Sequence, residues 1–250
     1  MRLLRGILAL YPLALVAILW QIAASLGWVR PIFLPSLTKI VEITPKLLTD
    51  GEVISPLFVS LYRAAAGLIL AMAIGIPLGF LIARIRWIRW LFDPFVAVGP
   101  PSPKIAFLPV FVLWFGIGHL SKILLVTFTT VFPFIIAAYA GAMTVPVNQL
   151  WAARAMGTSN LGLLRRVILP ASLPALMNGF RVAVPYALMT AFTAEMIAGG
   201  GGLGGALVLA QRYFDTPTVF VYILIMLIVG YIGDNAVTWL RRRILRWHEE

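Results

Sequence analysis

Long runs of apolar side chains constrain the fold of this chain more than any other feature. Several runs exceed about 18 residues, the length that a helix needs to cross a hydrocarbon core about 30 Å thick. A soluble domain is about half apolar, whereas 61% of these 250 residues are hydrophobic and only 12% are charged. In lipid, a helix satisfies all of its backbone hydrogen bonds within one segment. We therefore expect an all-α membrane protein in which residues 1–250 form a single domain with about six spans.

Short polar, glycine-rich or proline-rich segments separate the predicted spans. The spans cover residues 7–28, 57–83, 91–115, 120–143, 171–198 and 217–240. We interpret the first run as an uncleaved span, because the apolar core of a signal peptide has only about 7 to 15 residues. Residues 30–56 are polar and mixed, which predicts an exposed loop with one short surface helix. Residues 199–205 are almost all glycine, but no Lys-Ser or Lys-Thr pair follows them, so we expect a flexible external loop rather than a phosphate-binding loop.

Two of the spans carry small residues at every fourth position, which places these residues on one helix face. The two series are Gly67, Ala71, Gly75, Gly79 and Ala83, and Gly179, Ala183, Ala187 and Ala191, the latter leading to Glu195. Small residues allow helix backbones to approach closely in a membrane, so both faces are predicted to pack against other helices.

The third span holds five prolines, at positions 94, 100, 101, 103 and 109, and these forbid a straight helix. This span is either a broken segment that lines a water-filled path or a kinked packing helix.

The formal net charge of +11 raises the question of nucleic-acid binding. Six spans place both termini and the alternate loops on one side, and that side carries twelve arginines against two glutamates. The opposite side carries five cations, Lys122 among them, against four acids. Basic residues concentrate in cytoplasmic loops, so both termini are predicted to be cytoplasmic. The positive charge is then a signal of topology and of contact with membrane lipid, and nucleic acid is not required as a partner.

Four charged residues within the spans are candidates for a path or gate: Arg63, Lys104, Arg181 and Glu195. A charged side chain at the centre of a span costs about 2.5–3.5 kcal/mol on insertion scales, so it usually has a partner or faces water. Glu195 is either a gate residue or a buried structural acid, with the three cations as possible partners.

Cysteine is absent and neither of the two histidines has neighbouring ligands, so we expect no metal site. Clustered catalytic side chains are also absent, which argues against an enzyme.

Residues 146–170 contain the signals of two short helices outside the bilayer. Asn148 is predicted to cap the first helix, which runs through residues 149–156 and ends at Gly157. Thr158 and Ser159 can cap a second helix that ends near Pro170. The segment mixes exposed apolar residues with arginines, so it lies on lipid headgroups or inserts into a partner protein. The residues alone leave these alternatives equal.

The same segment resembles the E-A-A-x3-G-x9-I-x-L-P signature of ABC importer membrane subunits. The matching positions are Ala152, Ala153, Gly157, Val167, Leu169 and Pro170. Trp151 stands where the signature has glutamate, so a salt bridge made there in relatives is missing or replaced. Further motifs resemble the nitrate, sulfonate and taurine branch of these permeases. They include Ser60-Leu61-Tyr62-Arg63, Asp93-Pro94, Trp114-Phe115-Gly116-Ile117-Gly118, Gly179-Phe180-Arg181 and Gly202-Leu203-Gly204.

This resemblance implies a type I ABC importer (MetI-like) fold in the bacterial inner membrane, and import of a small, anionic solute such as nitrate, sulfonate or taurine. It implies that residues 146–170 are coupling helices that dock into an ATPase. The implied coupling residues are Trp151, Ala152, Ala153, Arg154, Gly157, Thr158, Ser159, Val167, Leu169 and Pro170. The implied partners are a second copy of this chain, two ABC ATPases that hold ATP and Mg²⁺, and a periplasmic or lipid-anchored binding protein. The main alternative is an ATP-independent secondary transporter or channel.

Overall fold

The computed structural model describes residues 2–245, with side chains from residue 11 onward. Every regular element in this part of the chain is helical, as predicted. The elements are α1 (Arg2–Ser25), α2 (Leu37–Thr49), α3 (Ile54–Arg84), α4 (Arg86–Val98), the 3-10 helix η1 (Lys104–Phe107), α5 (Leu108–Phe115), α6 (His119–Met143), α7 (Val147–Ala155), α8 (Asn160–Leu163), a π turn (Leu164–Ile168), α9 (Leu169–Ala198), α10 (Gly202–Arg212) and α11 (Thr216–Ile244). Four of the described helices are long and apolar enough to cross a membrane: Ile54–Arg84, His119–Met143, Asn160–Ala198 and Thr216–Ile244.

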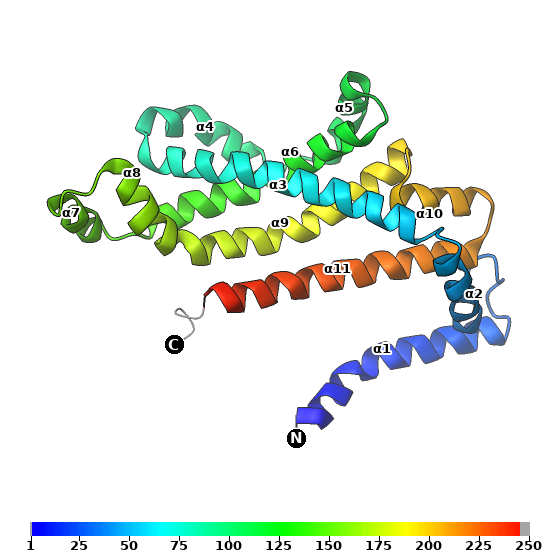
Figure 1. Cartoon of the computed structure of the whole chain (residues 1–250). Coiled ribbons are helices and arrows are strands. Elements are labelled where there is room, and N and C mark those ends of the chain that lie inside the picture. The colour runs from blue at the N-terminus through cyan, green and yellow to red at the C-terminus, as the bar shows by residue number, and fades with distance from the viewer. Residues whose placement is uncertain (1, 246–250) are drawn as a thin grey trace.

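Helices α3, α6 and α9 lie side by side and form the centre of the bundle (Figure 1). The predicted small-residue face of α3 packs against α6, and Ala71 at its middle is fully buried. A Cβ atom added to Gly75 would lie 2.8 Å from the Cβ of Phe134 and 2.8 Å from the carbonyl oxygen of Val131. Only glycine therefore permits this close approach of the two backbones. The predicted packing face is confirmed.

The proline-rich third segment is broken, as its prolines predict. Helix α4 ends at Val98, residues 99–103 form turns, and the chain continues through η1 into the short helix α5. Pro94 is accepted inside α4, whereas the three prolines at 100, 101 and 103 fall in the turns, where no helical N–H donor is needed. In Figure 1, α5 stands away from the axis of the bundle. Neither α4 nor α5 is a complete span by itself.

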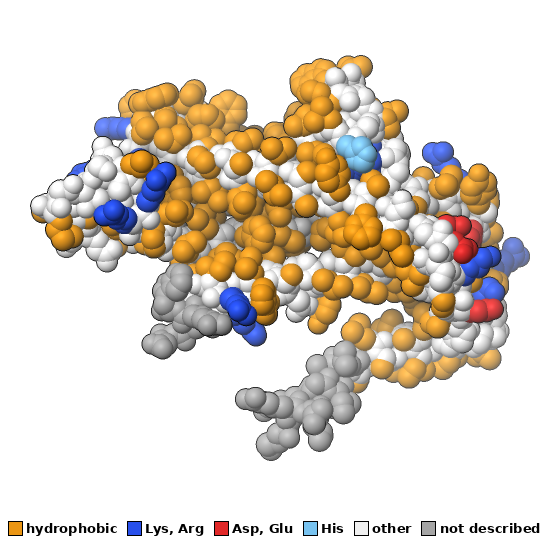
Figure 2. Space-filling view, viewed as in Figure 1, with side chains coloured by type: hydrophobic (Ala, Val, Ile, Leu, Met, Phe, Trp, Pro, Cys, Tyr) orange, Lys and Arg blue, Asp and Glu red, His pale blue; other side chains and the backbone are white. Residues whose placement is uncertain are grey.

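The helices divide between the two ends of the bundle (Figure 1). α7 and α8 lie at one end, and both the start of α1 and the end of α11 point toward that end. α2 and α10 lie at the opposite end. α2 is the short helix expected within residues 30–56, and Ser36 caps it by accepting the Lys39 backbone N–H at 3.3 Å. Figure 2 shows hydrophobic side chains along the sides of the long helices, as a lipid environment requires.

The segment of residues 199–205 is not the flexible loop that its composition predicts. Gly199, Gly200 and Gly201 form a tight turn with positive φ angles, and helix α10 then begins at Gly202. The prediction failed because it rested on local propensity, in which glycine disfavours a helix. Contacts from distant parts of the chain order this segment instead.

Candidate functional site

The first candidate region is the α7–α8 unit, residues 147–163, which projects from one end of the bundle (Figure 1). Gly157 ends α7 with a φ of 79°, and Thr158 donates its backbone N–H to the Ala153 carbonyl at 3.1 Å. This bond is typical of a glycine-terminated helix. Ser159 then caps α8 by accepting the Gly162 N–H at 3.2 Å. The predicted turn and cap are confirmed.

Two details of this unit differ from the prediction. Pro146, not Asn148, is the N-cap residue of α7, because its carbonyl already accepts the Gln149 N–H at 3.0 Å. The second helix also does not end near Pro170. Leu164–Ile168 form a π turn, in which Leu169 donates to the carbonyl of Leu164, five residues earlier. This wider turn accommodates the proline ring, so Pro170 follows it without ending the helix, and residues 160–198 form one long helix.

The α7–α8 unit is anchored on one side and exposed on the other. Ala153 and Leu163 are buried in a cluster with Phe80 and Val145, which fixes the unit to the ends of α3 and α6. Trp151 is 62% exposed and Met156 is 79% exposed. Figure 2 shows Lys and Arg side chains at this end of the molecule. The result is a fixed surface that carries apolar and basic side chains outward.

The other predicted coupling residues divide in the same way between surface and core. Ala152, Arg154, Gly157, Ser159, Leu169 and Pro170 are exposed, whereas Thr158 and Val167 are partly buried. Most of the predicted coupling residues are thus accessible to a partner protein. Their role in coupling stays a prediction.

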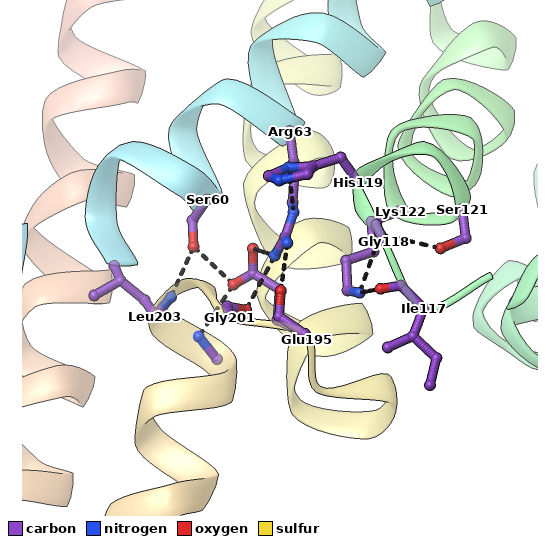
Figure 3. Close-up of polar contacts among 12 residues, drawn as sticks. Ser60, Arg63, Ile117, Gly118, His119, Ser121, Lys122, Glu195, Gly201 and Leu203 are labelled. Carbon is purple, nitrogen blue, oxygen red and sulfur yellow. Dashed lines mark hydrogen bonds and ion pairs between the residues drawn. The ribbon is translucent and has the colours of Figure 1, made fainter. Parts of the chain in front are cut away.

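The second candidate region is a buried ionic cluster between α3, α6, α9 and α10 (Figure 3). Glu195 on α9 is completely buried, and Arg63 on α3 is 1% exposed. The Arg63 Nη1 atom lies 2.9 Å from Glu195 Oε1, and the Ser60 hydroxyl donates to Glu195 Oε2 at 2.7 Å. Glu195 therefore has Arg63, one of its three predicted possible partners, in direct contact.

The same cluster explains why the glycine-rich segment is ordered. The Gly204 backbone N–H donates to Glu195 Oε2 at 3.1 Å, and the Leu203 N–H donates to Ser60 Oγ at 2.8 Å. A carboxylate at a helix N-terminus is stabilised by the helix dipole and by the free N–H groups. Arg63 completes the arrangement by donating to the carbonyls of Gly200 at 2.6 Å and Gly201 at 3.0 Å. Any side chain on Gly202 would overlap the Glu195 carboxylate, so glycine is required there.

Lys122 belongs to this buried region. The charge count had placed it in an exposed loop, and that assignment is wrong. It lies in the first turn of α6, is fully buried, and donates to the carbonyls of Ile117 and Gly118. Figure 3 shows it beside Arg63 and Glu195. These three described side chains carry two positive charges and one negative charge. The sequence signal that identifies this site is the pairing of Ser60 and Arg63 with a glycine run that follows Glu195.

The remaining two path candidates lie elsewhere. Arg181 on α9 pairs with Asp234 on α11 across 3.5 Å, and both side chains are about half exposed. Lys104 lies at the break between α4 and α5, where it borders a cavity. The structure thus joins Arg63 to Glu195 and separates Lys104 and Arg181 from them.

The cavity has a volume of about 730 Å³ and lies between the break, α6 and α9. This volume is within the usual range for small-molecule sites, about 300–1,000 Å³. Its walls are mainly apolar, with Phe132 and Met189 among them, and no Asp or Glu is among the described residues that line it. Its polar lining residues are Ser102, Lys104, Thr129, Asn178, Tyr186, Thr190 and Thr193. A small solute fits this space.

Comparisons with known proteins agree with this arrangement. A family model described as binding-protein-dependent transport system inner membrane component matches residues 75–246. The taurine transport system permease protein of Escherichia coli (strain K12) is 33% identical over 97% of this chain and 90% of its own length. A putative aliphatic sulfonates transport permease protein of Bacillus subtilis (strain 168) is 32% identical over 95% of this chain and 86% of its own.

Solved structures show the same fold. An inward-facing structure of the MetNI methionine ABC transporter contains a chain that aligns with a TM-score of 0.66 at 20% identity. The alignment covers 77% of this chain and 95% of that one. The all-helical architecture, the matching family model and these relatives lead to one conclusion. This chain belongs to the binding-protein-dependent transport system inner membrane component family and is a multi-pass permease subunit of an ABC importer.

Proposed function

We propose that this permease subunit imports a small organic anion, with sulfonates as the substrate class, across a bacterial inner membrane. ATP and Mg²⁺ are bound by separate ABC ATPase subunits, and this chain holds no cofactor and hydrolyses no ATP. The names of the Escherichia coli and Bacillus subtilis relatives support sulfonates. A cavity whose described lining includes a lysine and no acid supports an anion.

The observation that carries ATP-driven import is the α7–α8 unit. A loop that only connected two spans would not need an anchored pair of helices with Trp151 and Met156 held outward. Large exposed apolar side chains on a fixed surface are typical of protein docking sites. Trp151 takes the place of the usual acidic contact and packs into the groove of an ATPase.

The charge distribution supports a proposal for the orientation of the chain. We place the α7–α8 end in the cytoplasm because the termini and the loops assigned to that side carry twelve arginines against two glutamates. Figure 2 shows Lys and Arg side chains at both ends of the molecule, with Asp and Glu side chains beside them at the α2 and α10 end. The complete importer contains two copies of this chain, two ATPases and a periplasmic or lipid-anchored binding protein. The cavity is partly open, and our proposal is that the second copy covers the opening.

Replacing Trp151 by alanine tests the docking surface. We expect the variant to lose about 2 kcal/mol of binding free energy, or about thirtyfold in Kd for the ATPase, because a buried tryptophan is a typical interface hot spot. The measurement is the amount of ATPase that co-purifies with the tagged permease from the native host. Trp87→Ala is the matched control, since Trp87 on α4 is exposed to a similar degree, 66% against 62%.

The outcomes separate the possible functions. Loss of ATPase with Trp151→Ala but not with Trp87→Ala supports the proposal. If wild-type permease never retains an ATPase, import is not ATP-driven and an ATP-independent transporter becomes the better description. If Trp151→Ala retains as much ATPase as wild type, docking occurs elsewhere.

A second test concerns the turn between α7 and α8. Gly157 and Gly51 have nearly equal φ angles, 79° and 76°, and no atom lies near a Cβ added to either. Alanine in this conformation costs about 1–2 kcal/mol at each site. We expect Gly157→Ala and Gly51→Ala to lower thermal stability alike, but only Gly157→Ala to reduce solute-stimulated ATP hydrolysis in the purified importer. Equal ATPase activity in both variants would contradict a coupling role for this turn.

A further inference from the structure

Lys104 occupies an unusual position within the membrane part of the chain. It is the first residue of η1, directly after the turns that break the third segment, and it is partly buried in the wall of the cavity. Irregular backbone is tolerated at membrane depth where it faces protein or a water-filled space. The break therefore brings a cationic side chain to the edge of the open volume.

The ammonium group of Lys104 has only neutral partners in the described structure. It donates to the carbonyl oxygens of Pro100 at 2.9 Å and Ser102 at 3.4 Å, and it lies 5.4 Å from the centre of the Phe132 ring. An ammonium has three N–H donors, and the two carbonyls take two of them. A cation in apolar surroundings that lacks a counter-ion is costly, so an anion that enters the cavity gains a strong, charge-assisted contact.

The other intramembrane cations do not share this property. Arg63 is neutralised by Glu195 and Arg181 by Asp234, at 2.9 and 3.5 Å. Lys122 has no partner carboxylate within ion-pair distance, but it is completely buried, so a solute in the cavity cannot reach it. None of these three residues lines the cavity. Lys104 is the one Lys or Arg among the described lining residues.

We infer that Lys104 is the residue of the transport path that receives the oxyanion group of the solute. This inference rests on the proposed function. It extends that function by naming Lys104 as the residue that contacts the solute, and a small organic molecule with one sulfonate group as the ligand. Two of the lining hydroxyls do not share this role, because Thr129 and Thr193 donate their own hydroxyl protons to the Leu125 and Met189 carbonyls. They therefore have no proton left to donate to an oxyanion, and Lys104 supplies the charged donor.

The competing explanation is that Lys104 only stabilises the broken backbone by binding two carbonyls. The absence of cysteine from this chain permits a test on a single folded sample. The Lys104→Cys variant is purified with its ATPases and binding protein and reconstituted in proteoliposomes. The introduced thiol is then treated with an aminoethyl thiosulfonate reagent, which attaches an ammonium, or with a methyl thiosulfonate reagent, which adds no charge.

ATP-driven uptake of taurine and ethanesulfonate is measured before and after each treatment. We expect uptake by Lys104→Cys to fall about tenfold or more, because a hydrogen bond to a charged group is lost. The aminoethyl reagent restores at least half of the wild-type rate, and the methyl reagent does not. Ethanesulfonate slows labelling of the thiol. Lys104→Arg, which keeps the charge, retains most of the uptake.

Arg181→Gln is the matched control, since it removes a cation from α9 that does not line the cavity, and its uptake should stay at the wild-type level. Uptake by Lys104→Cys at the wild-type rate, or equal recovery with both reagents, overturns the inference while leaving the proposed function intact. Labelling that ethanesulfonate does not slow overturns it as well, because that result is expected if Lys104 only binds the two carbonyls. If wild-type proteoliposomes import neither sulfonate, the proposed substrate class itself is wrong, and the inference fails with it.

Discussion

Replacing Glu195 by glutamine is expected to destabilise the permease by about 3–5 kcal/mol, because it leaves a buried charge without its partner. Arg63 loses its counter-ion at 2.9 Å, and the cluster is left with two buried cations, Arg63 and Lys122. The N-terminus of α10 also loses the carboxylate that accepts the Gly204 N–H. Thermal unfolding in detergent, followed by the monodisperse fraction after heating, measures the loss.

Two further variants make this prediction specific. Asp234→Asn removes the acid of a half-exposed ion pair between α9 and α11, and it should cost no more than about 1 kcal/mol. Arg63→Met should be less damaging than Glu195→Gln, because Glu195 and Lys122 then remain as opposite charges. Equal stability of Glu195→Gln and wild type would show that the buried pair is not needed to hold α10. Wild-type transport by a normally assembled Glu195→Gln variant would rule out a gate role.

A valine at Gly75 is expected to cost about 3 kcal/mol, the upper end of the usual range for overpacking. The α3 and α6 backbones meet at this position, and even one added carbon lies 2.8 Å from Val131 O, which belongs to the backbone and cannot rotate away. The helices must separate, and the adjoining contacts of Ala71 and Gly79 are then lost as well. The same heating assay on purified permease reports the effect.

Gly230 provides the control for this substitution. It lies within α11, and no atom is found near a Cβ built on it in the described structure. Gly230→Val should leave the stability unchanged or slightly higher, because glycine is a poor helix former. A Gly75→Val variant as stable as Gly230→Val would mean that the contact between α3 and α6 is looser than the structure indicates.

The parts of the fold that could be predicted depend on local patterns. Hydropathy located the long helices, and the spacing of Gly67, Ala71, Gly75 and Gly79 identified the face that packs on α6, because both signals repeat along one helix. Gly157 and Ser159 were identified as turn and cap for the same reason: their conformation is set by neighbouring residues.

The rest depends on contacts between distant residues. Helix α10 forms in a glycine run because Ser60 binds its first turn and Arg63 binds the turn before it, and both residues lie more than 130 residues earlier. The burial of Lys122 has the same long-range origin, since nothing near it in sequence predicts a closed pocket. The four charged path candidates cannot be distinguished in the sequence. Only the packing shows that Arg63 and Glu195 form a buried pair, that Arg181 is in a half-exposed pair, and that Lys104 lies at a cavity.

The π turn before Pro170 has a mechanical consequence. Because the turn does not interrupt the helix, residues 160–198 form one continuous rod of 39 residues, which is about 58 Å long. One end of the rod belongs to the α7–α8 unit, its middle borders the cavity, and Glu195 near the far end holds α10. A tilt of about 5° at the near end displaces the far end by about 5 Å at this length. By geometry alone, a helix of this length turns a small rotation at its near end into a displacement at its far end that is comparable to the size of a small solute.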